Sequence, residues 1–504
     1  MNLMQTDPRF LNRPVEALLF LASYKAFGTN PLGYHIFNDA LEITACWLIF
    51  LCFKRTTNSP LISLLCALLF LLLPTHNATH YWVSCICVNL SLCLYLGSLF
   101  CDIEGAIRGR TDLHFASAIL FLISLLNYEI FLPLAALNVM AVFLLRTSKQ
   151  SYKDSLVYTL KPLALLTVST ILLFVYLKLI MPLFGKAWMH RIAFEPALFF
   201  KNLSAGILLN SPTSLAPFVA EKLKQAFGEG LATVQWLKLT GIAAIVSSAA
   251  ILSKILPTEE KGLSYTKDYK VAGAFLIIGS LTVLGSYTIF CFNPEYLPTL
   301  DTPVNRINIA ASIGLSMIFC SILLLLLDLF NKSKKWHALG SLAFSLPLLI
   351  SLTITNWTLA KPYELSWQVQ SYVMGKLREN KDKLKNYKFL IFSGCSRYSG
   401  EAPVLDGIWD FRPMARIVLN RPELDGTVVS SRLKVSKSGI KDMVGDLVCT
   451  STDYTGMIGI FIPSFIMIEI ASPNQFVDLI EERGLQFESK ELTKEWRKQL
   501  KEGR

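Results

Sequence analysis

The sequence has few charged residues, and this scarcity excludes a soluble globular protein. Only 17% of its 504 residues are Asp, Glu, Lys or Arg, whereas an average soluble domain carries about 25%. Long apolar runs stand where the charges are missing, and roughly 20 apolar residues are enough for a helix to cross a bilayer. We therefore expect an all-α polytopic membrane bundle.

Several motifs of known chemistry are also missing. The polar C-terminal part has no phosphate-binding glycine loop, dinucleotide-binding glycine pattern, zinc-protease motif or nucleophile elbow. Nine of the eleven cysteines fall in apolar runs, where cysteine usually packs as a small apolar residue. The other two, Cys395 and Cys449, could form a disulfide outside the cytoplasm, an alternative that the sequence leaves open. The first residues lack an apolar core, so we expect no cleavable signal peptide.

Ten apolar runs are long enough, or nearly so, to span the membrane. Residues 1–33 precede them and are expected to form an external segment with an interfacial helix, because charges and Asn30-Pro31 interrupt their apolar pattern. The transmembrane domain is expected over residues 34–358. Its predicted spans are 34–53, 60–74, 82–101, 113–127, 130–146, 155–181, 234–255, 270–292, 307–330 and 338–355.

Lys and Arg predict the orientation of these spans. They concentrate in alternate short loops, which places those loops in the cytoplasm. The turns near residues 76, 129 and 301, the long loop 182–233 and the C-terminal domain 359–504 are then external. That domain is expected to be α/β, with a polar helix over 359–385, strands over 388–394, 415–419, 428–430, 457–463 and 465–470, and helices over 475–483 and 489–501. The net charge of +11 thus indicates topology, not a nucleic-acid surface.

Candidate functional residues gather in the external turns. Imidazole, carboxylate and guanidinium groups at one membrane face suit a reaction on a lipid phosphate, since a base can take a proton and cations can hold the phosphate. The alternatives are structural: histidines that face water or begin a span, an acidic cap, or an arginine that snorkels to the interface. The candidates are His76, His80, Trp82, Glu129, His190, Arg191, Glu295, Asp301 and Arg306, with His35 favoured as structural.

The order of four passages resembles multi-pass GT-C glycosyltransferases, including polyprenyl-phosphate-sugar-dependent bacterial enzymes and the membrane part of tetratricopeptide-linked O-mannosyltransferases. Residues 13–43 resemble the family's R-P…F-G-x-N-P-x-G-Y-H-x-x-N passage. Residues 72–84 resemble its P-x-H…W-I-S turn and residues 123–137 its L-x-K-E…P turn. Residues 305–317 resemble the arginine-containing start of a late span, so the resemblance covers roughly residues 10–360.

The resemblance implies roles for single residues. Glu129 would lie beside the donor, His76 would position phosphate or acceptor, and Arg306 would bind phosphate, together with His190 and Arg191 of the long loop. The family's usual base is an acidic residue in an outer loop after a first span. This chain begins inside that loop, so Asp7 takes that position, and we expect a truncated or divergent relative.

Three further positions qualify the resemblance. Tyr128 stands where the family often has Lys, and Ala78 stands where it often has an acidic residue. His80 has no counterpart in the pattern and ranks lowest among the candidates, grouped with Trp82 and Asp301 as acceptor or loop residues.

The sequence therefore predicts an integral membrane glycosyltransferase of a bacterial inner membrane. It would move a sugar from a polyprenyl-phosphate donor to a glycan, lipid or protein acceptor on the outer face. A divalent cation is compatible with this class, but no ligand cluster in the sequence specifies a metal. The rivals are a non-catalytic membrane scaffold and a polysaccharide transporter or flippase, and the near absence of mid-span charges counts against the latter.

Overall fold

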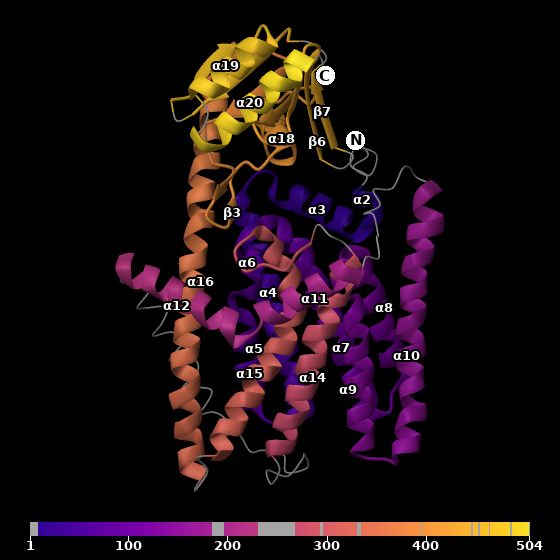
Figure 1. Cartoon of the computed structure of the whole chain (residues 1–504). Helices are drawn as coiled ribbons and strands as arrows, with labels where there is room; N and C mark the ends of the chain where they lie inside the picture. The colour runs from indigo at the N-terminus through magenta and orange to yellow at the C-terminus, as the bar shows by residue number, and fades with distance from the viewer. Residues whose placement is uncertain are drawn as a thin grey trace. The chain divides into compact units, whose positions relative to one another are not determined.

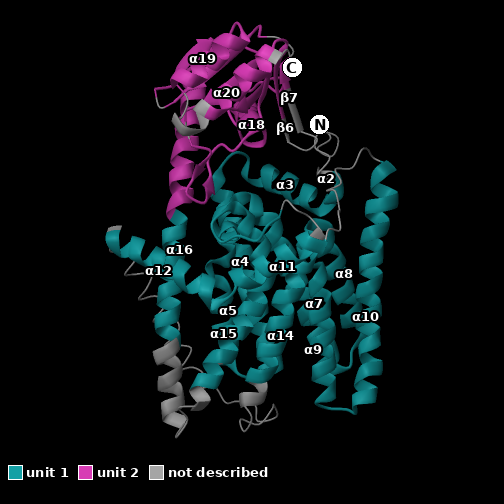
Figure 2. Cartoon of the chain, in the orientation of Figure 1, with its two compact units in different colours: residues 1–360 teal, residues 361–504 magenta. Residues whose placement is uncertain are grey.

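The computed structural model describes residues 9–183, 196–229, 268–292, 296–329 and 334–502, except for residues 395, 445–446, 452–453, 463 and 484–485. Two compact units make up the chain: unit 1 contains residues 1–360 and unit 2 residues 361–504 (Figure 2). The division falls two residues beyond the domain boundary expected from the sequence.

Unit 1 is a bundle of helices joined by short 3-10 turns (Figure 1). Its described helices are α2 (Arg9–Asn12), α3 (Pro14–Phe27), α4 (Pro31–Thr57), α5 (Pro60–Leu72), α6 (Ala78–Tyr81), α7 (Ile86–Arg108), α8 (Thr111–Asn127), α9 (Ala135–Thr147), α10 (Tyr152–Val175), α11 (Pro196–Leu209), α12 (Pro212–Glu229), α14 (Asp268–Thr288), α15 (Ile309–Leu329) and the first part of α16 (Lys334–Glu379). The turns are η1 (Pro74–His76), η2 (Val83–Cys85), η3 (Glu129–Leu134), η5 (Met181–Leu183), η7 (Ile289–Phe292) and η8 (Pro303–Asn308), and a π-helical turn, η4 (Tyr176–Ile180), follows α10.

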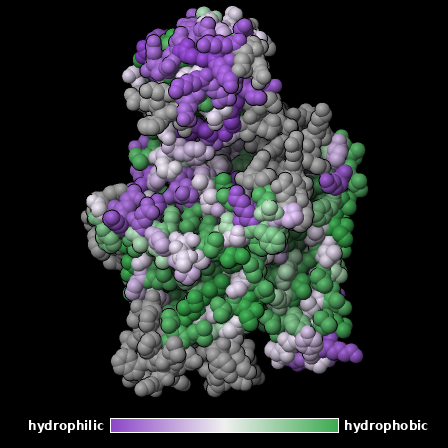
Figure 3. Space-filling view, in the orientation of Figure 1, coloured by the Kyte–Doolittle hydropathy of each residue, from purple (hydrophilic) through white to green (hydrophobic). Residues whose placement is uncertain are grey.

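Five helical segments of the described residues are long and apolar enough to cross a membrane. They are Pro31–Thr57, Val83–Arg108, Glu129–Thr147, Tyr152–Leu183 and Pro303–Leu326, and the pair α11 and α12, bent by 53°, would make a sixth if it forms one span. Shorter apolar helices cover Ile62–Leu72, Thr111–Asn127 and Ala272–Thr288. Apolar residues cover much of the side of unit 1 visible in Figure 3. The protein is thus a helical, multi-pass membrane protein. The predicted span 234–255 lies outside the described residues.

The ends of the spans follow from local sequence. Proline at the first helical position begins α4 and α5, where its missing N–H costs nothing. The side chains of Asn30 and Ser59 cap these two helices by accepting from the backbone N–H groups of Leu32 and Ile62. Two glycines allow α14 and α15 to approach closely, because a Cβ at Gly279 would lie 2.6 Å from the Gly314 carbonyl oxygen.

One sequence-based expectation about the helices changes. The stretch 359–385 does not form a separate helix, since α16 continues without a break from the predicted span into it. The described part of loop 182–233 forms α11 and α12, which fits the expectation that a loop of this length carries helices. A helix, α3, is present where an interfacial helix was expected.

Unit 2 contains a four-stranded sheet with helices on both faces. The strand order is β4 (Asp425–Val428), β1 (Phe389–Ser393), β8 (Met457–Phe461) and β9 (Ile466–Glu469), with β1 parallel to β4 and β8. Alternate residues of β1 pack into different clusters: Phe389 and Ile391 with α19 (Pro473–Arg483) and α20 (Gln486–Glu502), and Leu390 and Phe392 with α18 (Ile408–Leu419) and the end of α16. A two-stranded sheet joins β2 (Tyr398–Ser399) and β3 (Ala402–Pro403), and a three-stranded sheet joins β5 (Lys434–Ser436), β6 (Gly439–Val444) and β7 (Leu447–Ser451). A short helix, α17 (Lys381–Leu384), precedes β1.

The strand expected over residues 415–419 is wrong. These residues are the last part of α18, which begins at Ile408 and buries Phe411, Ala415 and Leu419 at helical spacing. A short apolar run is compatible with strand or helix, and only the longer pattern separates the two. The three strands β5, β6 and β7 were not predicted, because their polar residues hide the alternation.

Candidate functional site

The turns that carry the candidate residues meet at one end of the bundle. Asparagines join two of them: Asn305 donates to the Oδ1 of Asn77 at 2.8 Å and accepts from the Ala78 N–H at 3.0 Å. Asn308 donates to the Thr75 carbonyl at 2.8 Å. The neighbouring turns η1 and α6 are therefore joined to η8, which lies more than 220 residues further along the chain. The three turns form one hydrogen-bonded piece (α6 is labelled in Figure 1).

A pair of histidines lies in this piece. Their ring centroids are 5.0 Å apart. The Nδ1 atom of His76 lies 3.0 Å from the Ser312 hydroxyl, and the Nδ1 atom of His80 lies 2.9 Å from a Glu42 carboxylate oxygen. The Nε2 atoms of both histidines are buried and have no hydrogen-bond partner among the described residues. Such orphaned buried nitrogens point to a functional role, because unpaired buried polar atoms cost free energy.

The two histidines differ in exposure and in charge preference. His76 is completely buried, and burial together with the neighbouring His80 lowers its pKa well below the ordinary value. The His80 side chain is 11% exposed. Burial lowers the pKa of His80, but the carboxylates of Glu42 and Asp39 together more than offset this effect, so the net shift is upward. His80 is thus the more exposed histidine of the pair and the one whose charged form is favoured.

Glu42, on α4, is held in place by amides. The side-chain amides of Asn38 and Asn89 each donate to its Oε1 at 3.2 Å, and both also donate to the Thr79 carbonyl at 2.9 Å. The carboxylate therefore orients the His80 ring in the way that an acidic partner orients the histidine of a catalytic dyad.

A second row of groups contains Glu129 and Arg306. Arg13 makes a two-pronged ion pair with Glu129, at 2.7 and 2.9 Å, and its guanidinium lies 4.1 Å from the centre of the Tyr128 ring. The Tyr128 side chain also interacts electrostatically with Arg306, whose guanidinium lies 5.4 Å from the centre of the Trp82 ring. Arg306 also donates to the Pro303 carbonyl at 2.8 Å. Tyr128 therefore interacts with the guanidinium groups of both Arg13 and Arg306, and Glu129 pairs with Arg13.

The predicted residues are therefore distributed unevenly. His76, His80, Trp82, Glu129 and Arg306 lie in the two adjacent groups just described. Asp301 is exposed in the loop before η8 and makes no hydrogen bond or ion pair with the described residues of either group. Asp7, His190, Arg191 and Glu295 lie outside the described residues, as does Cys395.

Sequence reasoning missed Glu42 and Arg13 as site residues. Arg13 belongs to the quoted family-like passage, and Glu42 closes it, so the passage contained the signal without a role for either. Glu42 lies within an apolar span, where a charged residue is a functional candidate by default.

Among the described residues, no group of three or more His, Cys, Asp or Glu side chains is arranged to hold a metal ion. The two unpaired histidine nitrogens would supply only two of the ligands that a divalent transition metal needs.

Unit 2 has its own polar cluster at the carboxyl ends of the parallel strands. Asp406 pairs with both Arg397 and Arg432, and Arg432 lies 4.6 Å from the Trp409 ring. Burial raises the pKa of Asp410 to about 6, although an N–H bond from Asp406 opposes this shift. Ligands of α/β sheets commonly bind at this edge, but here the charges are already paired with one another.

Comparison of the chain with protein-family models, curated proteins and solved structures found no match.

Proposed function

We propose that this protein is an integral membrane glycosyltransferase, which moves a sugar from a polyprenyl-phosphate donor to a glycan, lipid or protein acceptor. The proposal is supported most by the meeting of the His80 and Arg306 turns with Glu129 at one end of the bundle. The family-like passages supplied these turns one by one, and nothing in their sequence spacing requires them to meet.

The proposed setting is a bacterial inner membrane. In it the chain crosses the bilayer about ten times, and the site and the C-terminal unit face outward. The Lys and Arg residues of the alternate loops support this orientation.

His80 has the proposed role of general base. An acceptor hydroxyl attacks the anomeric carbon of the sugar and gives its proton to the unpaired Nε2 of His80. The bond between that carbon and the phosphate oxygen breaks, and the polyprenyl phosphate leaves with the electron pair. Glu42 stabilises the imidazolium that forms, at 2.9 Å from Nδ1.

The guanidinium of Arg306 has the proposed role of holding the leaving phosphate. Cations aimed at developing negative charge in a site with little water are worth far more than in bulk solvent. Trp82 and Tyr128 keep Arg306 in place. Both oxygens of Glu129 bind Arg13, so the proposed role of Glu129 is to order this row and not to accept a proton.

Sugar transfer in proteoliposomes tests this proposal. Labelled polyprenyl-phosphate sugars are supplied, and Glu129→Gln and Arg306→Ala are each expected to reduce transfer by about 10² or more, since each removes a charge from the row. The matched controls are Asp112→Asn and Arg110→Ala, which alter an exposed ion pair elsewhere in the bundle. Transfer at the unaltered rate in both site variants would refute the assignment. Absence of transfer by well-inserted protein with every donor tried would favour a binding scaffold.

A transporter or flippase is the second candidate function. Among the described residues, Asp102 and His114 form a buried hydrogen-bonded pair of ionisable side chains inside the bundle, a feature that proton-coupled transporters use. Donor counterflow across the proteoliposome membrane without sugar transfer would support this alternative.

A further inference from the structure

Arg146 is a buried cation without a counter-ion among the described residues. It lies in the last turn of α9 and is only 9% exposed. Its Nε atom is buried and has no hydrogen-bond partner, and no carboxylate in the described part of the chain forms an ion pair with it. Burial of a charge is costly unless an opposite charge and hydrogen bonds accompany it. Arg146 therefore lacks the partner that its burial requires.

Two neighbours offset this charge only in part. The guanidinium lies 3.6 Å from the centre of the Tyr158 ring, on α10, in cation–π geometry. A Cβ built on Gly109, the residue that ends α7, would lie 3.6 Å from Arg146 Nη2, so the guanidinium also adjoins the negative end of the α7 dipole. A helix end carries about half an elementary charge. These neighbours orient the guanidinium and leave it net positive.

The arginines on either side of Gly109 show the opposite arrangement. The Arg108 side chain, which is 53% exposed, pairs with Glu104 at 2.6 Å. The Arg110 side chain, which is 54% exposed, pairs with Asp112. Exposed arginines have little need of a carboxylate, because water solvates them, whereas a buried arginine needs one. The unpaired cation is thus specific to Arg146, and it points to an anion supplied from outside the chain.

The position of Arg146 indicates where such an anion would come from. Arg146 ends the segment Glu129–Thr147, and the next segment, Tyr152–Leu183, starts six residues later; both are long and apolar enough to span a membrane. The connection between them carries Lys149 and Lys153, which are exposed. Arg146 therefore lies at the boundary between hydrocarbon and water, at the depth of the lipid head groups.

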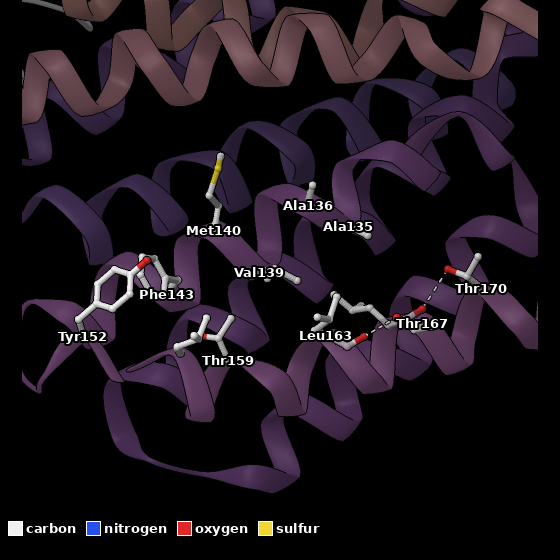
Figure 4. Close-up of a pocket in the computed structure, with 12 residues that line it drawn as sticks. Ala135, Ala136, Val139, Met140, Phe143, Tyr152, Thr159, Leu163, Thr167 and Thr170 are labelled. Atoms are coloured by element: carbon white, nitrogen blue, oxygen red, sulfur yellow. Dashed lines mark hydrogen bonds between the residues drawn. The ribbon is translucent and has the colours of Figure 1, made fainter. Parts of the chain in front are cut away.

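An apolar surface begins one helical turn before Arg146. There the rings of Phe143 and Tyr152 pack edge to face, with centroids 5.4 Å apart, at the end of the groove between α9 and α10 (Figure 4). The side chain of Leu156, also on the groove wall, is 50% exposed. A ligand at Arg146 thus has lysines on its watery side and hydrocarbon on the other, which suits a lipid better than a soluble anion.

We infer that Arg146 binds the phosphate of an anionic phospholipid of the bilayer. A guanidinium can donate two parallel hydrogen bonds to phosphate oxygens, and such charge-assisted bonds are strong where little water competes. Lys149 and Lys153 favour a head group with net negative charge over one that carries its own cation. The inference concerns a bilayer lipid and not a sugar donor, so it is independent of the proposed enzyme activity.

Thermal unfolding of the full chain in detergent tests this inference. Dioleoyl phosphatidylglycerol is titrated into the micelles, and phosphatidylcholine with the same acyl chains is the comparison. A lipid that binds the folded protein raises Tm, so phosphatidylglycerol should raise Tm more than phosphatidylcholine does. In Arg146→Gln, the phosphatidylglycerol concentration that gives half of the rise should increase about tenfold, the loss expected for one hydrogen bond to a charged group.

Two further variants separate binding from folding. Arg110→Gln is the matched control, because it removes the same charge from an exposed and already paired arginine at the neighbouring turn. It should titrate like the unaltered chain. Arg146→Lys keeps the charge and loses the two-pronged geometry, so its titration should lie between those of the unaltered chain and Arg146→Gln. Without lipid, Arg146→Gln should be about as stable as the unaltered chain, since no ion pair is lost.

A second measurement needs no variant. Phosphatidylglycerol with a diazirine on its head group, in proteoliposomes, should label the α9–α10 connection and the adjoining α7–α8 turn more than the other connections between helices. Labelling spread evenly over all connections would overturn the inference. So would an equal effect of phosphatidylglycerol on Arg146→Gln and on the unaltered chain. An equal rise in Tm with inorganic phosphate at matched ionic strength would assign the site to a soluble anion and refute the lipid.

Discussion

The bundle buries two histidine clusters that differ in how completely their nitrogens are paired. His114 has partners for both: Nδ1 lies 2.7 Å from Asp102 and Nε2 lies 3.1 Å from the Tyr158 hydroxyl. His76 and His80 each pair only Nδ1 and leave a buried Nε2 without a partner among the described residues. Both nitrogens of His114 are paired without a ligand, whereas His76 and His80 each have one unpaired nitrogen.

The position of each cluster along α7 fits this difference. Asp102 is 16 residues beyond the first residue of α7, or about 24 Å along the helix from the turn that carries His80. Its carboxylate also accepts from Ser117 and Asn138 at 2.7 and 2.9 Å. A polar network of this kind between membrane helices stabilises and orients them. The comparison teaches that a buried histidine by itself indicates little, and that its unpaired nitrogen carries the functional information.

The largest expected effect is on stability, at the Asp102–His114 cluster. Asp102→Leu leaves His114, Ser117 and Asn138 without their shared partner and should destabilise the protein by about 3 kcal/mol or more. Thermal unfolding in detergent measures the change. Asp112→Leu, at an exposed carboxylate, should change stability by less than about 0.5 kcal/mol. Equal stability of the two variants would remove the structural role from the first cluster.

The incomplete cluster should show the opposite pattern. His80→Gln is expected to reduce sugar transfer by about 10² to 10³, the range typical for loss of a general base, with little loss of stability. His35→Gln is the control, because His35 lies near the start of α4 and does not belong to the histidine pair. A variant that unfolds as readily as the Asp102 variant would mean that both clusters are structural.

Glu42→Gln should shift the pH dependence of transfer. His80 acts as a base in its neutral form, so the rate rises as the pH passes its pKa. Glu42 raises that pKa despite burial, and the variant should therefore reach half-maximal rate at a lower pH, with a smaller maximum. A raised histidine pKa also stabilises the fold below about pH 6.5, and this contribution is lost as the pH rises through the raised value. Destabilisation by the variant should accordingly be greater at acidic than at alkaline pH.

The smallest expected effect is that of Tyr158→Phe. It removes the hydroxyl that pairs with His114 Nε2 and with the Gly105 carbonyl, each at 3.1 Å. We expect a loss of about 1 kcal/mol of stability, the ordinary contribution of such a hydrogen bond, and unchanged transfer. A marked fall in transfer would show that the two clusters are coupled.

Sequence reasoning was most successful where apolar runs are long. The starts of α4 and α5 lie at or within three residues of the predicted spans, because proline and a capping residue mark both. It failed at residues 415–419, where a five-residue apolar run was taken for a strand and belongs to α18. Short runs carry too little periodicity to separate helix from strand.

The residues of the candidate site were likewise predicted only in part. Glu129, His76 and Arg306 were predicted from the resemblance, and Glu129 and Arg306 lie in one row with Arg13 and Tyr128. His80 was ranked lowest because it has no counterpart in the family pattern, yet the structure gives it the carboxylate of Glu42. A family pattern can assign only positions that the family shares, and it says nothing of a new pair.

The sequence by itself determined that this is a helical membrane protein with a polar C-terminal unit, because hydrocarbon admits only long apolar helices and Lys and Arg mark their ends. Only the tertiary structure decided which polar groups pair. Arg13 meets Glu129 across 116 positions of sequence, and the asparagines of η8 lock the His80 turn in place. Such pairs depend on how helices pack, and packing distances between remote segments leave no periodic trace in the sequence.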